Sequence, residues 1–144
     1  MTYLLDINVL VALFDSAHVH HEAAHRWFAV IGSWATCPIT ENGFVRVVSN
    51  PVYPTVSVSP GEATDRLRVF CSAPEHVFWP DTVSLTDPTL FDNSQLRGHQ
   101  QLTDLYLVGL ALRHSGKLAT FDSRIPVAAL VGGAPDIVEM IPIA

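Results

Sequence analysis

The feature of this sequence that most constrains its fold is a series of short, largely apolar runs separated by segments of helix length. These runs lack polar alternation, so any strand that they form must be covered on both faces. Such strands alternating with helices are typical of a parallel sheet that carries helices on both sides. The pattern predicts the α/β class, with strands at Tyr3–Leu5, Trp34–Ile39, His76–Trp79, Lys117–Phe121 and Ile137–Ile141.

Helices are expected between these strands. Side chains that can cap a helix precede two of them, and a glycine follows a third. The proline-rich stretch from Asn50 to Pro60 breaks any regular pattern, so it is expected to be a loop. The predicted helices and their caps are Val9–Phe14 after Asn8, His18–Ile31, Glu41–Val48 after Thr40, Gly61–Ser72, Pro88–Leu96, Gln100–His114 before Gly116, and Pro126–Val131.

The chain has 144 residues, the size of one ordinary domain, and residues 1–144 are expected to form one. It is 49% apolar and only 15% charged, which excludes disorder. The densest apolar runs, Val9–Phe14 and Leu105–Leu112, are far shorter than the roughly 18 residues that a bilayer requires. The N-terminal segment has no Lys or Arg and is interrupted by Asp6, unlike a signal peptide. Cys37 and Cys71 are too few for a disulfide framework or a cysteine metal site, so we expect reduced core cysteines in a cytoplasmic protein.

The net charge of −6 comes from fourteen acidic and eight basic residues. Loose binding to nucleic acid depends on Lys and Arg side chains, so this balance argues against it and directs attention to the acids. Four acids stand at junctions between predicted elements. Asp6 follows the first strand, Glu41 lies in the first turn of the helix after the second strand, Asp104 lies near the start of helix 100–114, and Asp122 ends the fourth strand.

The carboxyl ends of parallel strands form one edge of a sheet, where open α/β sheets bind ligands. Three of the four acids are expected at this edge, and Asp104 starts a helix that can face it. Like charges in one cleft repel one another unless a cation neutralises them, and carboxylate oxygens suit Mg²⁺ or Mn²⁺. Structural roles explain two of the acids singly: the helix dipole favours Glu41 in a first turn, and Asp122 suits a turn. Asp104 is the hardest to explain in this way, and Asp6 is unexplained because Asn8 can cap the helix. Together the four acids predict a metal centre of the kind that hydrolyses phosphodiesters.

The residues around these acids resemble the acidic motifs of PIN domains, and more narrowly the ribonuclease toxins of VapC type from bacterial toxin–antitoxin modules. The resemblance covers the whole chain, including Asn50-Pro51-Val52-Tyr53-Pro54 and Phe78-Trp79-Pro80. The motifs that carry it are Leu4-Leu5-Asp6-Ile7-Asn8-Val9-Leu10, Thr40-Glu41, Thr103-Asp104-Leu105-Tyr106-Leu107 and, most specific of all, Leu118-Ala119-Thr120-Phe121-Asp122.

The resemblance implies a three-layer sandwich of PIN type and an endoribonuclease that depends on Mg²⁺ or Mn²⁺. Asp6, Glu41, Asp104 and Asp122 match the acidic quartet of the family and are the expected catalytic residues. Asp6, Asp104 and Asp122 are expected to bind the metal, and Glu41 to hold a water molecule or a second metal. Asn8 is expected to hydrogen-bond one of these acids rather than the metal.

The resemblance also implies partners that the sequence itself does not reveal. These are an RNA substrate, a homodimer, and a cognate antitoxin of VapB type that binds the toxin in a hetero-oligomer and covers the active-site groove. An antitoxin Arg or Lys that reaches the acidic cleft is electrostatically sensible. The low positive charge favours a specifically recognised, structured RNA over indiscriminate degradation.

Two other interpretations compete with the nuclease. His21-Glu22-Ala23-Ala24-His25 fits the H-E-x-x-H pattern of zinc metallopeptidases, which places two His on one helix face beside a general base. No third ligand has the spacing of the longer motif, so we interpret the segment as part of an amphipathic helix. A catalytically silent PIN module that binds RNA or protein is the other alternative, although all four acids are present.

Overall fold

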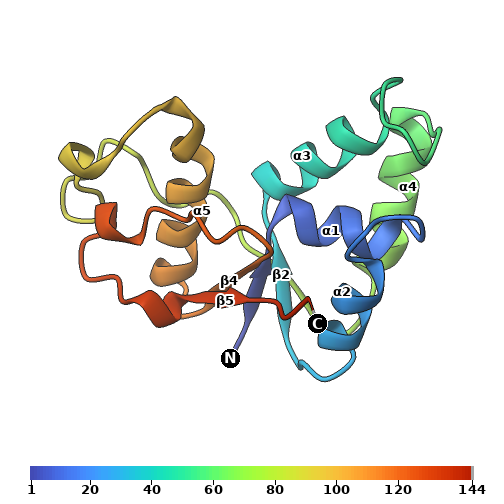
Figure 1. The fold of residues 1–144 in the computed structure, drawn as a ribbon. Coiled ribbons are helices and arrows are strands. Elements are labelled where there is room, and N and C mark those ends of the chain that lie inside the picture. The colour runs from blue at the N-terminus through green and yellow to red at the C-terminus, as the bar shows by residue number, and fades with distance from the viewer. Residues whose placement is uncertain (144) are drawn as a thin grey trace.

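The computed structural model describes residues 1–143 and contains one five-stranded parallel sheet (Figure 1). The strand order is β3-β2-β1-β4-β5, and every neighbouring pair is parallel. The predicted α/β class is therefore confirmed. The strands are β1 (Tyr3–Leu5), β2 (Trp34–Thr36), β3 (His76–Phe78), β4 (Lys117–Thr120) and β5 (Val138–Met140).

Helices cover both faces of the sheet, as the apolar strands require. Helix α5 packs on one face and the other four α-helices on the opposite face (Figure 1). No helix formed by residues 1–143 has the length and apolar character needed to cross a membrane. The α-helices are α1 (Ile7–Phe14), α2 (His21–Phe28), α3 (Pro38–Val48), α4 (Pro60–Phe70) and α5 (Leu102–Arg113), with 3₁₀ turns η1 (Asn93–Gln95), η2 (His99–Gln101), η3 (Val127–Ala129) and η4 (Pro135–Ile137).

Alternate residues of each strand serve two separate apolar cores. Leu4 and Leu118 face α5, whereas Leu5, Trp34 and Ala119 face the layer of α1 to α4. This is the two-residue period of a β-strand. A residue's position in its strand therefore decides on which side of the sheet its side chain emerges.

The strand order places β1 at the centre, between β2 and β4. The chain leaves β1 toward β2 and β3, and later returns to the other side of β1 through α5 and β4 (Figure 1). The connections diverge between β1 and β4, and open α/β sheets bind ligands at such a switch point, outside the carboxyl ends of the strands.

Two helix starts differ from the prediction. Asp6, not Asn8, is the N-cap of α1, and its side chain accepts a hydrogen bond from the N–H of Ile7. Helix α3 begins at Pro38 rather than at Glu41, because proline is well suited to a first helical position. Thr40 is thus the third residue of α3, and its hydroxyl accepts a hydrogen bond from the N–H of Cys37.

Other predicted elements are shorter or absent. Helix α2 begins at His21 and ends at Phe28 instead of spanning 18–31, and only the 3₁₀ turn η3 forms in the segment 126–131. The predicted helix over 88–96 is wrong. Asp87 and Asp92 each accept hydrogen bonds from residues two positions later, which closes local turns, and Phe91 pairs with Leu130 in an isolated bridge.

The C-terminus of α5 ends in a Schellman motif, displaced by one residue from the prediction. Ser115, not Gly116, adopts the left-handed conformation, with φ of 55°. The N–H of Gly116 donates to the carbonyl of Ala111, and the N–H of Ser115 donates to that of Leu112. Gly116 is needed for a different reason: a Cβ there would lie 2.5 Å from the carbonyl oxygen of Thr2.

Replacing Ser115 by glycine is expected to stabilise the protein. The left-handed conformation costs a residue with a Cβ about 1–2 kcal/mol, and the greater freedom of glycine in the unfolded chain removes part of the gain. Ser115→Gly should therefore raise the free energy of unfolding by about 0.5–1 kcal/mol in urea denaturation.

Gly116→Ala is the matched comparison and is expected to lower the free energy of unfolding by about 1–3 kcal/mol, because the new methyl group meets backbone and the Trp79 ring. A loss of stability in Ser115→Gly would contradict this description of the helix end.

Candidate active site

Asp6 is a buried carboxylate at the end of the central strand. Its side chain is only 5% exposed, and both carboxylate oxygens accept hydrogen bonds. Oδ1 accepts from the N–H of Ile7 at 2.7 Å, and Oδ2 accepts from the Thr120 hydroxyl at 2.7 Å. Burial raises the pKa of Asp6 although these bonds favour its charged form. A charge held here requires compensation from its surroundings.

Thr120 links Asp6 to Asn8, a role that the sequence did not reveal. The Asn8 amide donates to the Thr120 hydroxyl at 3.2 Å, and that hydroxyl donates to Asp6. The expectation that Asn8 bonds an acid directly is wrong, because Thr120 stands between them. Thr120 is fully buried at the end of β4. In the sequence, the signal for its role was a polar residue within an otherwise apolar predicted strand.

Asp104 lies in the first turn of α5, close to the positive end of the helix dipole. Its pKa rises to about 6, first because the carboxyl is partly buried, then because of the negative charges of Asp6 and Asp122. Arg124 acts in the opposite direction. Three of the four predicted acids, those at 6, 104 and 122, are therefore near enough for their charges to interact.

Asp122 lies two residues beyond β4 and is the most hydrated of the three. Its Oδ1 accepts hydrogen bonds from the N–H of Arg124 at 2.9 Å and from the guanidinium Nε at 3.2 Å. Burial acts to raise the pKa of Asp122, but these bonds and the positive charge of Arg124 outweigh it and lower the pKa. Arg124 is thus a cation at the edge of the acidic group, with its side chain 87% exposed.

Glu41, the fourth predicted acid, makes its hydrogen bond with β2 rather than with one of these aspartates. Its carboxylate accepts a hydrogen bond from the Thr36 hydroxyl at 2.7 Å. Thr36 follows Trp34 in the two-residue period of β2, so its side chain emerges on the face of α1 to α4. Thr120 follows Leu118 and emerges on the α5 face with Asp6. Glu41 is therefore hydrogen-bonded to β2 on the face of α1 to α4, from the first turn of α3.

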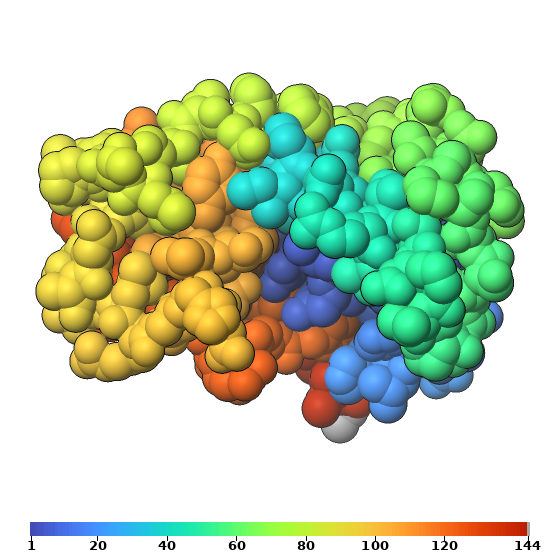
Figure 2. Space-filling view, turned by 90° about the horizontal axis from the view of Figure 1, so that it is seen from above, coloured from blue at the N-terminus to red at the C-terminus, as the bar shows by residue number. Residues whose placement is uncertain are grey.

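The edge of the molecule at the carboxyl ends of the strands is hollowed (Figure 2). Seen onto the carboxyl ends of the strands, the blue N-terminal segment lies at the bottom of a hollow (Figure 2). The orange start of α5 and the teal α3 form its walls (Figure 2). We call Asp6, Asp104 and Asp122 the acidic triad. Its oxygens are hard ligands that fit Mg²⁺ or Mn²⁺.

The paired histidines of the H-E-x-x-H segment have a structural role. The Nδ1 atom of His21 lies 2.7 Å from the carbonyl oxygen of Ala12, and Nε2 of His25 lies 2.8 Å from that of Leu13. Both rings thus satisfy carbonyl groups at the C-terminal end of α1, which otherwise lack partners. Within residues 1–143 no third ligand accompanies them.

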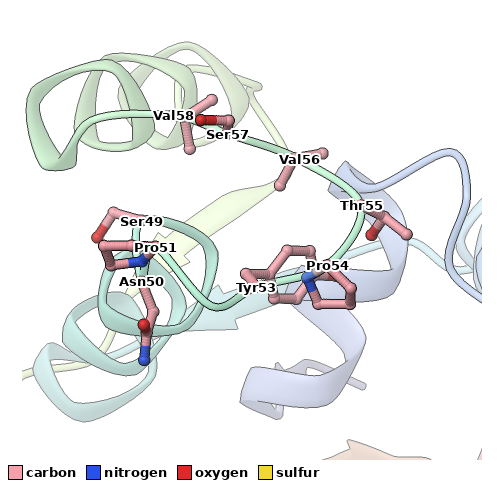
Figure 3. Close-up of a pocket in the computed structure, with 9 residues that line it drawn as sticks. All are labelled: Ser49, Asn50, Pro51, Tyr53, Pro54, Thr55, Val56, Ser57 and Val58. Carbon is pink, nitrogen blue, oxygen red and sulfur yellow. The ribbon is translucent and has the colours of Figure 1, made fainter.

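A cavity of about 370 Å³ lies elsewhere, within the loop of residues 49–58 (Figure 3). The loop is fastened to the end of α1, where the Tyr53 and Thr55 hydroxyls donate to the buried carboxylate of Asp15. The residues that line the cavity carry no acid, base or thiol (Figure 3). This cavity offers no catalytic groups, so the acidic triad remains the candidate site.

Comparison with known proteins places the chain in a family. The PIN domain model matches residues 3–130. The chain is 45% identical to Ribonuclease VapC44 of Mycobacterium tuberculosis over 134 residues, covering 92% of this chain and 94% of that protein. Ribonuclease VapC39 of the same species is also 45% identical, with 92% and 96% covered.

Two solved structures share the fold. The toxin VapC20 of Mycobacterium tuberculosis, described as cleaving the Sarcin-Ricin loop, aligns with a TM-score of 0.62 at 11% identity, covering 92% of this chain and 99% of that one. A toxin–antitoxin complex from Klebsiella pneumoniae aligns with a TM-score of 0.61 at 17% identity, covering 99% of each chain. The parallel sheet, the family match and the identity along nearly whole VapC chains agree, and the protein belongs to the VapC type of the PIN-domain family.

Proposed function

We propose that this protein is a metal-dependent endoribonuclease toxin that hydrolyses RNA phosphodiester bonds. The observation that carries the proposal is the acidic triad, three neighbouring carboxylates around the switch point of a parallel sheet. Two relatives with 45% identity over nearly their whole length are named ribonucleases. Their names supply the reaction class, and the triad supplies the groups to carry it out.

The donor set of the triad fits Mg²⁺ or Mn²⁺, with Asp6, Asp104 and Asp122 as the residues that would hold the ion. Burial, and then the like charges of Asp6 and Asp122, raise the pKa of Asp104, and a divalent cation relieves the repulsion among these charges. When bound, such an ion supplies an activated water and stabilises charge on phosphate oxygens. No side-chain nucleophile is required.

The chain's own residues orient the triad. The N–H of Ile7 and the Thr120 hydroxyl fix both oxygens of Asp6, and Asn8 in turn holds Thr120. Arg124 keeps Asp122 ionised and places a positive charge beside the triad for a substrate phosphate. Lys117 is the first residue of β4 and Arg113 is the last residue of α5. These two basic residues therefore lie at the ends of β4 and α5 that are away from the triad.

The catalytic role predicted for Glu41 stays a separate prediction, because its carboxylate hydrogen-bonds to Thr36 and not to a residue of the triad. Glu41→Gln tests it directly. A loss of RNA cleavage as large as that in Asp104→Asn would bring Glu41 back into the catalytic group, and near-normal cleavage would remove it.

The proposal includes an antitoxin of VapB type and a homodimer. A basic side chain of the antitoxin that enters the hollow would neutralise the acidic triad as a cation does. The solved structure from Klebsiella pneumoniae is evidence for the fold alone, but its name describes a complex of a toxin with an antitoxin. Replacing Asp104 or Asp122 by a neutral residue should then weaken antitoxin binding. The proposed homodimer is tested separately, by measuring the mass of the protein in solution by light scattering.

We expect Asp104→Asn to abolish cleavage of RNA, with a fall in rate of at least about 100-fold, because an amide is a poor ligand for a hard cation. The assay uses a pool of cellular RNA, metal-free protein, and added Mg²⁺ or Mn²⁺ or EDTA.

Asp136→Asn is the matched control for this experiment, since Asp136 is exposed and belongs to η4. Cleavage that persists in EDTA, or that survives in Asp104→Asn, would refute the proposed mechanism. A folded wild-type protein that cuts no RNA with either metal would favour the silent binding module.

Thr120→Val tests the positioning of Asp6. Valine keeps the shape of threonine but removes the hydroxyl that binds Asp6, Asn8 and the N–H of Asp122. Loss of a group that orients a metal ligand typically costs 10–100-fold in metal affinity or activity, and we expect a fall of about this size. The same variant should need more Mn²⁺ for half-maximal cleavage. An unchanged metal requirement would show that the hydroxyl has only a structural role.

The pKa of Asp104 makes the stability of the metal-free protein depend on pH. Because folding raises this pKa from 3.8 to about 6, the fold favours the neutral carboxyl. Its stabilising contribution is complete below about pH 4 and is lost as the pH rises through about 6. At about pH 8 in EDTA, Asp104→Asn should be more stable than the wild type by about 1–2 kcal/mol, once solvent screening of the half-buried group is allowed for.

The difference between the two proteins should vanish near pH 4, measured by thermal unfolding. Asp122→Asn is the control of opposite sign, because the pKa of Asp122 is lowered and its ionised form is favoured in the fold. Equal stability of the wild type and Asp104→Asn at both pH values would contradict the raised pKa of Asp104.

A further inference from the structure

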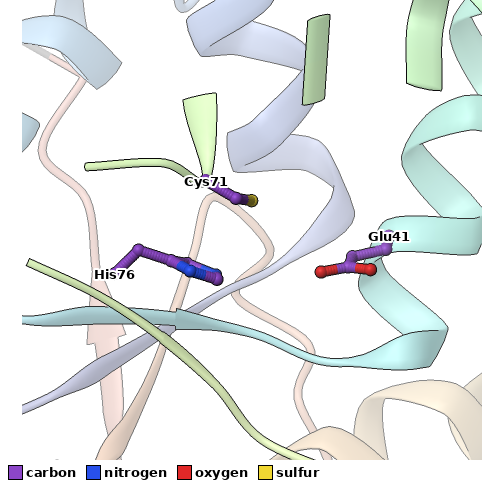
Figure 4. A group of neighbouring side chains, drawn as sticks. All are labelled: Glu41, Cys71 and His76. Carbon is purple, nitrogen blue, oxygen red and sulfur yellow. The ribbon is translucent and has the colours of Figure 1, made fainter. Parts of the chain in front are cut away.

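A second group of ligand-type side chains surrounds the Thr36 hydroxyl at the end of β2. Glu41, Cys71 and His76 each offer an atom to one space, and these atoms all lie within 4.8 Å of one another (Figure 4). Among residues 1–143 no other set of three acid, cysteine or histidine side chains is so closely grouped. Each of the three is only partly buried, so an ion in solution can reach them.

The three side chains come from separate elements that meet at the end of β2. Glu41 lies in the first turn of α3, Cys71 directly follows α4, and His76 begins β3. In Figure 4 the His76 ring and the Glu41 carboxylate point toward each other, with the Cys71 sulfur beside them. Cys71 packs against the apolar core as expected, but it is only partly buried and its sulfur also lies beside these polar groups.

The Thr36 hydroxyl contacts all three side chains but does not satisfy all of their hydrogen-bonding atoms. It donates to Glu41 and lies 2.7 Å from Nε2 of His76 and 3.9 Å from the sulfur of Cys71. One hydroxyl cannot saturate a carboxylate, an imidazole nitrogen and a thiol at once. The sulfur has no closer polar partner, and Glu41 makes no ion pair within residues 1–143.

We propose that Glu41, Cys71 and His76 form a binding site for Zn²⁺ that is separate from the acidic triad. One thiolate, one imidazole and one carboxylate are a ligand set that suits zinc, with a fourth position left for water or for the Thr36 hydroxyl. The soft sulfur disfavours Mg²⁺ and Mn²⁺, which prefer oxygen ligands alone. The two sites thus select different metals.

The geometry needs only small adjustment to hold the ion. Three atoms no more than 4.8 Å apart have a point within about 2.8 Å of all three, and zinc bonds are about 2.0–2.3 Å long. The difference to be closed is therefore less than about 1 Å for each ligand atom. Binding displaces the proton of Cys71, whose pKa burial raises, and so converts a neutral thiol into a ligand.

A bound ion would tie together α3, α4 and β3. The edge strand β3 is paired only with β2, and its residues Val77 and Phe78 are exposed. Anything that binds the folded chain and not the unfolded one raises the stability of the fold. The proposed site is therefore structural, and it does not depend on whether the acidic triad cleaves RNA.

The test is zinc binding by the metal-free full chain under reducing conditions, measured by competition with a chromogenic chelator. We expect one Zn²⁺ per chain and a higher Tm in its presence. Cys71→Ser and His76→Gln, which keep a polar group at each position, should each weaken binding at least about 10-fold. Co²⁺ in place of Zn²⁺ should give a thiolate-to-metal absorption band that Cys71→Ser removes.

Two control variants separate this site from its neighbours. Asp104→Asn, which removes an acid of the triad, should bind Zn²⁺ like the wild type. The double variant His21→Gln with His25→Gln tests the other histidine pair and should leave this binding unchanged. Absence of stoichiometric binding in the wild type, or equal affinity in Cys71→Ser and His76→Gln, would overturn the proposal, and neither result would affect the nuclease assignment.

Discussion

The hydrogen bond from the Thr120 hydroxyl to Asp6 is the interaction on which the candidate site depends. It holds a carboxylate that is 5% exposed at the end of the central strand, where an unpaired charge is costly. The N–H of Ile7 and the start of α1 offset part of that cost. The bond also joins the carboxyl ends of β1 and β4 at the switch point, so the same contact that stabilises the sheet edge orients the acid.

Much of this arrangement follows from local sequence patterns. Short apolar runs predicted the five strands, and acids directly after two of them predicted Asp6 and Asp122 at one edge, because parallel strands end together. The same patterns could not place Glu41. The start of α3 shifts from Glu41 to Pro38, and the Thr36 hydroxyl at the end of β2 donates to the Glu41 carboxylate. A hydrogen bond between side chains of two elements depends on their packing, which spacing along the chain does not reveal.

The other mispredictions share one cause, which is that side chains and tertiary contacts outweighed a local preference. Asp87 closes a turn in the segment expected to be helical. Gly116 was the natural residue for the left-handed position, yet the close approach of Thr2 and Trp79 requires a glycine one residue later in the motif. Ser115 then carries the strained conformation. Packing against the first strand thus decided the end of α5.

Repulsion among the three carboxylates of the acidic triad affects the stability of the fold, the binding of a metal ion and the binding of the antitoxin. Under the proposed function, a bound cation and a basic side chain of the antitoxin are alternative ways to relieve that repulsion, and both stabilise the fold by binding only the folded state. Each ligand favours the same ionised carboxylates, so the two compete for one site. An antitoxin that inserts a positive charge would therefore block RNA and displace the metal in a single step.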